Sequence, residues 1–175
     1  MIHAARALLP ASLLLLAGCM APMKLADFAA SRPELRPERF FAGETRGSGV
    51  IQTSGGRPSR TFEVLSIGSA QGDAIRVDQT IRYGDGKVER RTWQLRRVGP
   101  NRYEGALSDA AGPVRAEARG NALRLRYLLK RPAITMEQWL YLQPDGRTIL
   151  NEGTVRAFGI VAARISEQIV RSEPR

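Results

Sequence analysis

The sequence predicts an all-β protein folded as an antiparallel up-and-down barrel of about eight to ten strands. From Phe40 onward, short runs alternate between apolar and polar residues, and Gly, Pro and Asp residues separate the runs. No segment carries a helical pattern longer than about two turns. Successive hairpins favour a meander, and closure into a barrel removes the exposed edges of the sheet.

The clearest predicted strand covers residues 74–83, in which apolar Ile75 and Val77 alternate with Arg76 and Asp78. Gly84-Asp85-Gly86 follows it and indicates a hairpin, because Asp-Gly adopts the positive φ that a tight turn requires. Together the predicted strands form a single barrel domain over residues 40–171. The remaining strands are expected at 43–53, 61–68, 88–98, 102–108, 113–118, 123–130, 134–142, 148–156 and 160–170.

The first 18 residues are similar to a secretory signal peptide. A short start containing Arg6 precedes an apolar stretch at 7–17, which is shorter than the roughly 20 residues needed to span a bilayer. The stretch ends in Leu16-Ala17-Gly18-Cys19, which resembles a bacterial lipobox. We therefore expect a signal peptide at 1–18 and lipidation of Cys19. The alternative is an ordinary cleaved signal in which the cysteine is accidental.

Lipidation would anchor the protein, because each buried CH₂ contributes about 0.8 kcal/mol and two or more acyl chains hold firmly. Met20 rather than Asp follows the cysteine. By similarity to sorting in enterobacteria, this favours the periplasmic face of the outer membrane. Residues 19–39 are expected to be the acylated cysteine and a tether, reaching at most about 65 Å. Phe28 and Leu35 could dock this tether on the barrel.

The net charge of +10 comes from 27 basic and 17 acidic residues, and all basic residues except Lys24, Lys87 and Lys130 are arginines. This composition reflects either a GC-rich genome or attraction to anionic lipid head groups. The export signal argues against a nucleic-acid partner. The membrane, reached through the lipid anchor, is therefore the expected partner.

The residue inventory excludes several kinds of catalytic site. His3 is the only histidine and Cys19 the only cysteine, so a chain cleaved before Cys19 would keep 157 residues, no histidine and no free thiol. A Ser-His-Asp triad, a Cys-His pair, a histidine zinc site and a disulfide are then impossible. We expect no enzymatic activity, no cofactor and no metal site.

Arg91 and Trp93 are candidate ligand-binding residues because they share one face of a predicted strand with Leu95. If Trp93 points into the barrel, Arg91 does too, and a buried arginine needs a partner. Arg91 could hold a ligand carboxylate or phosphate against Trp93. It could equally close the barrel through a cation–π contact or an internal carboxylate.

Four further residues are weaker candidates. Asn151 alternates with apolar residues and is expected to point inward, as a ligand contact or as a structural amide. Trp139 lies either at the mouth of a cavity or on the membrane side. Tyr103 and Tyr127 are expected in the core, where they could border a ligand.

Several short motifs follow one another in a characteristic order. They are Phe40-Phe41-Ala42-Gly43-Glu44-Thr45 with Gly47 and Gly49, Tyr83-Gly84-Asp85-Gly86, Arg90-Arg91-Thr92-Trp93, Tyr103-Glu104-Gly105, Gly120-Asn121-Ala122-Leu123, Trp139-Leu140-Tyr141-Leu142, Asn151 and Phe158-Gly159-Ile160. In this order they resemble a family of bacterial lipoproteins known as domain of unknown function 3833, over residues 26–170. The resemblance implies a lipocalin-like, or calycin-like, barrel and no established activity. Two places depart from the family pattern, Glu137-Gln138 and Glu152.

These observations favour a membrane-anchored periplasmic lipoprotein whose barrel binds an apolar or lipid-like ligand, such as a fatty acid. A first alternative is a structural or envelope-assembly lipoprotein with a packed barrel and no ligand. A second is a lipid-modifying enzyme that works without histidine or cysteine.

Overall fold

The computed structural model describes residues 22–172. The expected signal peptide and the lipidation of Cys19 lie outside this range and stay predictions. Within it, no helix is both long and apolar enough to cross a membrane.

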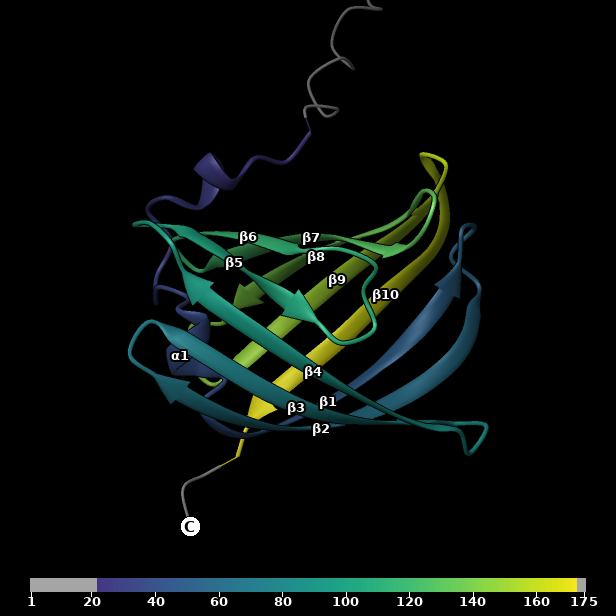
Figure 1. Ribbon diagram of the computed structural model, residues 1–175, viewed down its shortest axis with the longest axis horizontal. Helices are drawn as coiled ribbons and strands as arrows, with labels where there is room; N and C mark the ends of the chain where they lie inside the picture. The colour runs from purple at the N-terminus through teal and green to yellow at the C-terminus, as the bar shows by residue number, and fades with distance from the viewer. Residues whose placement is uncertain (1–21, 173–175) are drawn as a thin grey trace, which may run out of the picture.

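Ten antiparallel strands form a closed barrel (Figure 1). Each strand pairs with the next, and β1 pairs with β10 to close the sheet. The prediction of an all-β up-and-down barrel is therefore confirmed. The strands are β1 (Gly43–Thr53), β2 (Pro58–Gln71), β3 (Ala74–Tyr83), β4 (Val88–Arg97), β5 (Arg102–Leu107), β6 (Val114–Arg119), β7 (Ala122–Lys130), β8 (Ile134–Leu142), β9 (Thr148–Ala157) and β10 (Ile160–Arg171).

Alternation between buried inward residues and exposed outward residues is clearest in β6. In β6, Val114, Ala116 and Ala118 are buried, whereas the residues between them are exposed. Strand β2 is longer than expected, because it begins at Pro58. A proline is tolerated there, since the first residue of a strand need not donate a ladder hydrogen bond.

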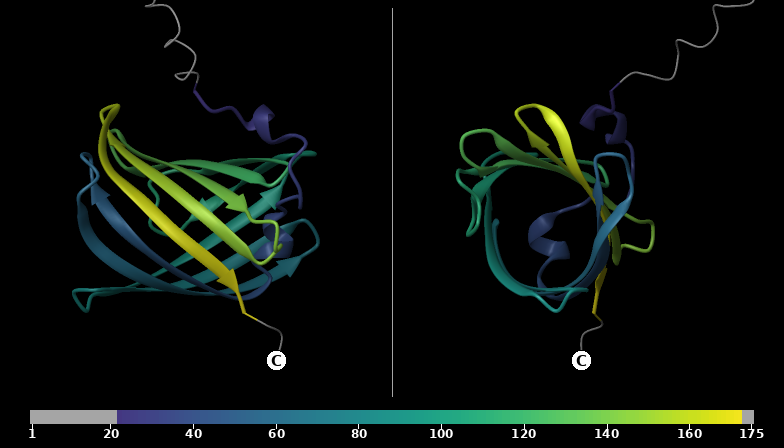
Figure 2. Two further views of the ribbon diagram at one scale, coloured as in Figure 1. Left: turned by 180° about the vertical axis from the view of Figure 1, so that it is seen from behind. Right: turned by 90° about the vertical axis from the view of Figure 1, so that its right-hand side faces the viewer.

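The segment before the barrel contains the 3₁₀ helix η2 (Leu25–Phe28) and the single-turn helix α1 (Pro37–Phe40). Figure 2 shows α1 inside the outline of the barrel when the molecule is viewed along its strands. Leu35, just before α1, is only 1% exposed, and its N–H donates to the Gly120 carbonyl over 2.8 Å. From Leu25 onward, the segment predicted as a tether therefore lies against the barrel.

The barrel has two different ends. We call the end that holds α1 the plug end; it also carries the β2–β3, β4–β5, β6–β7 and β8–β9 turns. The other, or far, end carries the β1–β2, β3–β4, β5–β6, β7–β8 and β9–β10 turns.

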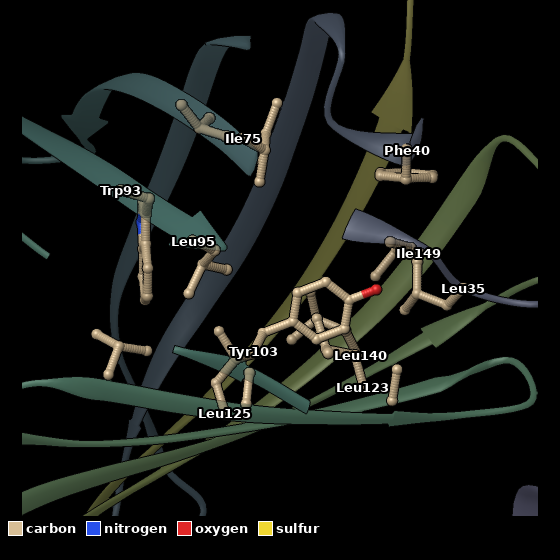
Figure 3. Packing of buried hydrophobic residues seen from close by; sticks show 14 of the residues in the cluster. Leu35, Phe40, Ile75, Trp93, Leu95, Tyr103, Leu123, Leu125, Leu140 and Ile149 are labelled. Carbon is tan, nitrogen blue, oxygen red and sulfur yellow. The ribbon is translucent and has the colours of Figure 1, made fainter. Parts of the chain in front are cut away.

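The main apolar core fills the barrel next to the plug (Figure 3). Leu35 and Phe40 from the plug segment meet Ile149 and Tyr103 from the wall. The Tyr103 hydroxyl donates to Glu38 Oε2 on α1 over 3.1 Å. Apolar packing and this hydrogen bond thus hold the plug in place.

Candidate functional site

A belt of polar side chains interrupts the apolar interior about halfway along the barrel. Its members occupy inward positions on seven of the strands, and they form two arms on opposite sides of the barrel. We call this group the polar belt, and it consists of Ser66, Gln79, Arg91, Tyr127, Gln138, Asn151 and Glu167.

The first arm centres on Gln79 of β3, which is paired with Ser66 on one side and Arg91 on the other. The Gln79 amide donates to Ser66 Oγ over 3.0 Å. Its oxygen accepts from Arg91 Nε at 2.9 Å and from Trp93 Nε1 at 2.7 Å. The Arg91 guanidinium also lies 5.6 Å from the centre of the Trp93 ring. Gln79 thereby holds the side chains of Arg91 and Trp93, the two candidates from the sequence, in place.

The two terminal nitrogens of Arg91 are not used by this arm. Within residues 22–172, neither nitrogen forms a hydrogen bond or an ion pair, and the Arg91 donor that is engaged is Nε. A guanidinium has five N–H donors, so four of them remain available.

The second arm runs from β10 to β7. The Asn151 amide donates to Glu167 Oε2 over 2.9 Å, and its oxygen accepts from Gln138 Nε2 at 3.5 Å. The Tyr127 hydroxyl donates to Gln138 Oε1 over 3.4 Å. Tyr127 also packs edge-on against Trp93, with ring centres 5.5 Å apart, which brings the two arms into contact.

Burial sets the protonation of this arm. Desolvation raises the pKa of the Glu167 carboxyl above its ordinary value, against smaller opposing effects of the Asn151 hydrogen bond and the Arg91 charge. Desolvation likewise raises the pKa of Tyr127 to about 12, so its hydroxyl stays protonated at neutral pH. The neutral form of Glu167 is thus favoured more than that of an exposed carboxyl, which leaves the Arg91 charge less compensated.

Glycines of β1 make room for the second arm. A Cβ on Gly47 would overlap the Oε1 atom of Glu167, and a Cβ on Gly49 would overlap the Phe62 ring. The wall therefore has no side chain of its own at these two positions. Glu167 occupies the space at Gly47, and the Phe62 ring occupies the space at Gly49.

The two arms border an internal cavity of about 60 Å³. One water molecule takes roughly 30 Å³ in the liquid, and an engineered apolar cavity of roughly 150 Å³ binds benzene. The space therefore fits a small group, and a longer molecule must displace side chains. The lining residues are Phe41, Ile75, Val77, Gln79, Arg91, Trp93, Leu95, Leu123, Leu125, Gln138, Leu140, Asn151, Glu167 and Ile169.

The structure brings together most of the candidate residues. Arg91, Trp93 and Asn151 line the cavity, and Tyr127 joins the polar belt beside them. Tyr103 points into the barrel nearer the plug, where it bonds Glu38.

Trp139 lies elsewhere, on the outer wall. Its neighbours in β8, Gln138 and Leu140, line the cavity, so the alternation of the strand turns Trp139 outward. There it is covered by Leu25 and Phe28 of the N-terminal segment. The structure therefore does not place Trp139 at the cavity, and its burial comes from a chain segment that the strand pattern could not reveal.

Sequence reasoning missed Gln79, Gln138 and Glu167. A signal was present, because Gln79 interrupts the apolar face of Val77 and Ile81. Glu167 interrupts the last strand in the same way. Polar residues at inward positions of alternating strands would have identified the belt.

The sequence matches the model of a family described as protein of unknown function (DUF3833) over residues 13–171. The chain belongs to the DUF3833 family. Among proteins of curated function, none matches this sequence.

Solved structures with the same architecture are distant in sequence. This DUF3833 protein is similar to the S-type phycobiliprotein lyase from Guillardia theta, with a TM-score of 0.63 and 10% identity, covering 88% of this chain and 100% of the lyase. Two barrels bound to DFHBI are also similar. Redesigned mFAP1 has a TM-score of 0.42 and 7% identity, covering 78% of this chain and 100% of mFAP1. EF1p2_mFAP2b has a TM-score of 0.44 and 9% identity, covering 78% of this chain and 98% of that barrel. The lyase likeness shows the fold and is consistent with a lipocalin-like barrel.

Proposed function

We propose that this DUF3833 protein is a binding module whose barrel receives a small amphipathic molecule with an anionic group, a carboxylate or a phosphate. One observation carries the proposal. The guanidinium of Arg91 lines a cavity inside the barrel and, within residues 22–172, forms no hydrogen bond or ion pair with a carboxylate.

The chemistry of Arg91 favours an anion. The Arg91 side chain is half-buried beside the cavity, and a partly desolvated charge is stabilised by an opposite charge and by hydrogen bonds. The planar guanidinium presents parallel N–H donors that match the two oxygens of a carboxylate or phosphate. Gln79 already holds Nε, so the side chain is oriented before the ligand arrives.

Glu167 strengthens the same preference. Because burial raises its pKa, the carboxyl is biased toward its neutral form, in which it can donate a hydrogen bond. A neutral Glu167 also leaves the positive charge of Arg91 uncancelled. An anionic ligand would supply the missing charge.

The rest of the lining accepts an apolar group. Nine of the lining residues are apolar and gather toward the plug, including Ile75, Leu95 and Ile169. The small volume admits an anionic group with a short apolar portion, and a lipid-like chain would have to move side chains aside. A short-chain fatty acid is the simplest molecule of this chemistry.

We also propose that the protein is a lipoprotein held at the periplasmic face of the outer membrane by acylated Cys19. The lipobox-like sequence supports this. Mass spectrometry of protein purified from its host membranes tests it. We expect a Cys19-terminal chain carrying acyl groups, and an unmodified cysteine would contradict it.

A packed structural barrel is the second candidate, and the modest cavity favours it. In that case Arg91 serves to close the barrel through its contact with Trp93. The two candidates differ in whether any molecule occupies the cavity.

Native mass spectrometry of host-purified protein separates them. We expect a small molecule of reproducible mass on the wild-type protein and its loss in Arg91→Ala. Arg90→Ala, an exposed neighbour on the outer face of the same strand, should keep it. An empty wild-type barrel, or equal retention by the Arg91 variant, would overturn the proposal.

A further inference from the structure

The β9–β10 turn at the far end carries an exposed apolar tip. Phe158 is 72% exposed and Ile160 is 76% exposed, the highest values among the large apolar side chains of residues 22–172. Figure 1 shows this turn, drawn yellow, projecting from the rest of the barrel. We call Phe158, Gly159 and Ile160 the tip.

The backbone of the tip does not explain why a phenylalanine is there. Phe158 has φ of 51° and Gly159 has φ of 82°, and Phe158 is the one non-glycine residue with positive φ in the described chain. Two-residue turns with two positive φ values normally take Asn or Asp followed by Gly. A bulky residue is strained in this region, and such strain is concentrated at functional sites.

The tip is also held in place. The Phe158 N–H donates to the Ala133 carbonyl over 3.1 Å, which ties the β9–β10 turn to the β7–β8 turn. The exposed side chains of Phe158 and Ile160 are thus carried by a turn that is hydrogen-bonded to its neighbour.

Three exposed cations lie beside the tip. Lys130 and Arg131 lie at the β7–β8 turn, and Arg156 lies two residues before Phe158 on β9. Within residues 22–172, none of the three pairs with a carboxylate. The tip is therefore an apolar point inside a positively charged rim.

The N-terminal segment lies on the same side of the barrel. In Figures 1 and 2, the first described segment, drawn purple, and the yellow tip both rise above the barrel. The expected acylated residue, Cys19, is three positions before Pro22 and so at most about 11 Å away along the chain. Because the chain is packed on the wall from Leu25 onward, so short a link would hold this side close to the bilayer.

We propose that the tip inserts into an anionic lipid bilayer, with Lys130, Arg131 and Arg156 on the lipid phosphates. An exposed apolar patch with a charged rim is typical of a membrane interaction site. Cations near an anionic surface add attraction that falls off within a Debye length. This surface is separate from the cavity and does not depend on Arg91.

Depth-dependent quenching tests the proposal on full-length lipidated protein in vesicles. The chain with Ile160→Cys receives a nitrobenzoxadiazole label, and the matched control carries the same label on Val88→Cys. Val88 is an exposed apolar residue at the β3–β4 turn, which lies on the opposite face of the barrel from the N-terminal segment (Figure 1). With brominated phosphatidylcholine and phosphatidylglycerol, we expect at least threefold stronger quenching at position 160. Equal or weaker quenching there would overturn the proposal.

A charge variant tests the rim. Replacing Lys130, Arg131 and Arg156 together by Ser should reduce quenching at 160 in phosphatidylglycerol vesicles to the level seen in pure phosphatidylcholine. Quenching that does not respond to the lipid charge or to this variant would contradict the role of the rim. A tip that is unquenched in vesicles but shielded in host envelopes would indicate a protein partner and overturn membrane insertion. Arg91→Ala should leave quenching unchanged, which separates this test from that of ligand binding.

Discussion

Charged side chains enter the barrel at two levels, and they are satisfied very differently. At the plug, Glu38 accepts from the Tyr103 hydroxyl at 3.1 Å. Arg36 donates to the Pro100 carbonyl at 3.0 Å and to Glu34 at 3.1 Å. In the polar belt, by contrast, Arg91 uses one donor on a neutral amide, and Glu167 sits on the opposite arm.

This difference separates a structural role from a binding role. At the plug, Glu38 and Arg36 form hydrogen bonds with neighbouring protein atoms, and these bonds fasten α1 into the barrel. The belt keeps charge and donors available beside a cavity. Within residues 22–172, no belt atom is both fully buried and without a partner, so the free Arg91 donors are open to water or to a ligand.

The largest expected effect is at the plug. Leu35→Ala should lower the free energy of unfolding by about 2–5 kcal/mol, because it removes a side chain that is buried among the core residues. Denaturant titration measures this. Leu150→Ala, at an exposed position, should change it by no more than about 0.5 kcal/mol. Equal effects of the two substitutions would show that the segment before the barrel is not part of the core.

Gly47→Ala should destabilise the belt by about 1–3 kcal/mol, because the new methyl group overlaps the Glu167 carboxyl. The same titration measures the loss. Gly55→Ala, in an open turn where a Cβ meets nothing, is the control. An unchanged unfolding midpoint for Gly47→Ala would mean that Glu167 has space to move and is not held by the belt.

Arg91→Ala should weaken binding of propionate by about tenfold or more, equivalent to roughly 1.4 kcal/mol, because a charge-assisted hydrogen bond is lost. Fluorescence titration through Trp93 provides the signal. Tyr103→Phe instead removes the hydroxyl that donates to Glu38 at the plug, and it should leave the affinity unchanged. If Tyr103→Phe weakened binding as much as Arg91→Ala, the distinction between the two levels would fail.

Glu167→Gln should have the smallest effect, and the size of the effect should depend on pH. A carboxyl whose folded-state pKa is raised stabilises the fold fully below its unfolded pKa and loses that contribution as pH rises through the folded pKa. The variant should therefore gain about 1 kcal/mol over the wild type at neutral pH, and less in acid. Unfolding at a series of pH values measures this, and a gain that grew toward acid would contradict the raised pKa.

The strands were predictable because one alternation rule governs nearly the whole chain. Residues 74–83 and 134–142 match β3 and β8 in full. Arg91 and Trp93 were found because residues two positions apart in a strand share a face, so an inward Trp93 places Arg91 inward as well. Gln79 and Glu167 were missed although each interrupts an apolar inward face. The local pattern does not show which polar residues of the paired strands lie beside them, which are Ser66 and Arg91 for Gln79 and Asn151 for Glu167.

The position of Trp139 shows a second limit of the sequence. Its strand pattern leaves it on the outer face, and a large aromatic there is compatible with a membrane, a ligand or a packed segment. The structure supplies Leu25 and Phe28 as its cover. The N-terminal segment has no regular apolar pattern, so the sequence does not show that it packs on the barrel wall.

Isothermal titration with propionate and with propan-1-ol tests the central claim most directly, because the two probes have the same number of carbon atoms and differ in charge. Wild-type protein should bind propionate more tightly than propan-1-ol, and Arg91→Gln should abolish that preference while Arg90→Gln keeps it. Equal affinity of the wild-type protein for both probes, or an undiminished preference in Arg91→Gln, would contradict an anion site at Arg91.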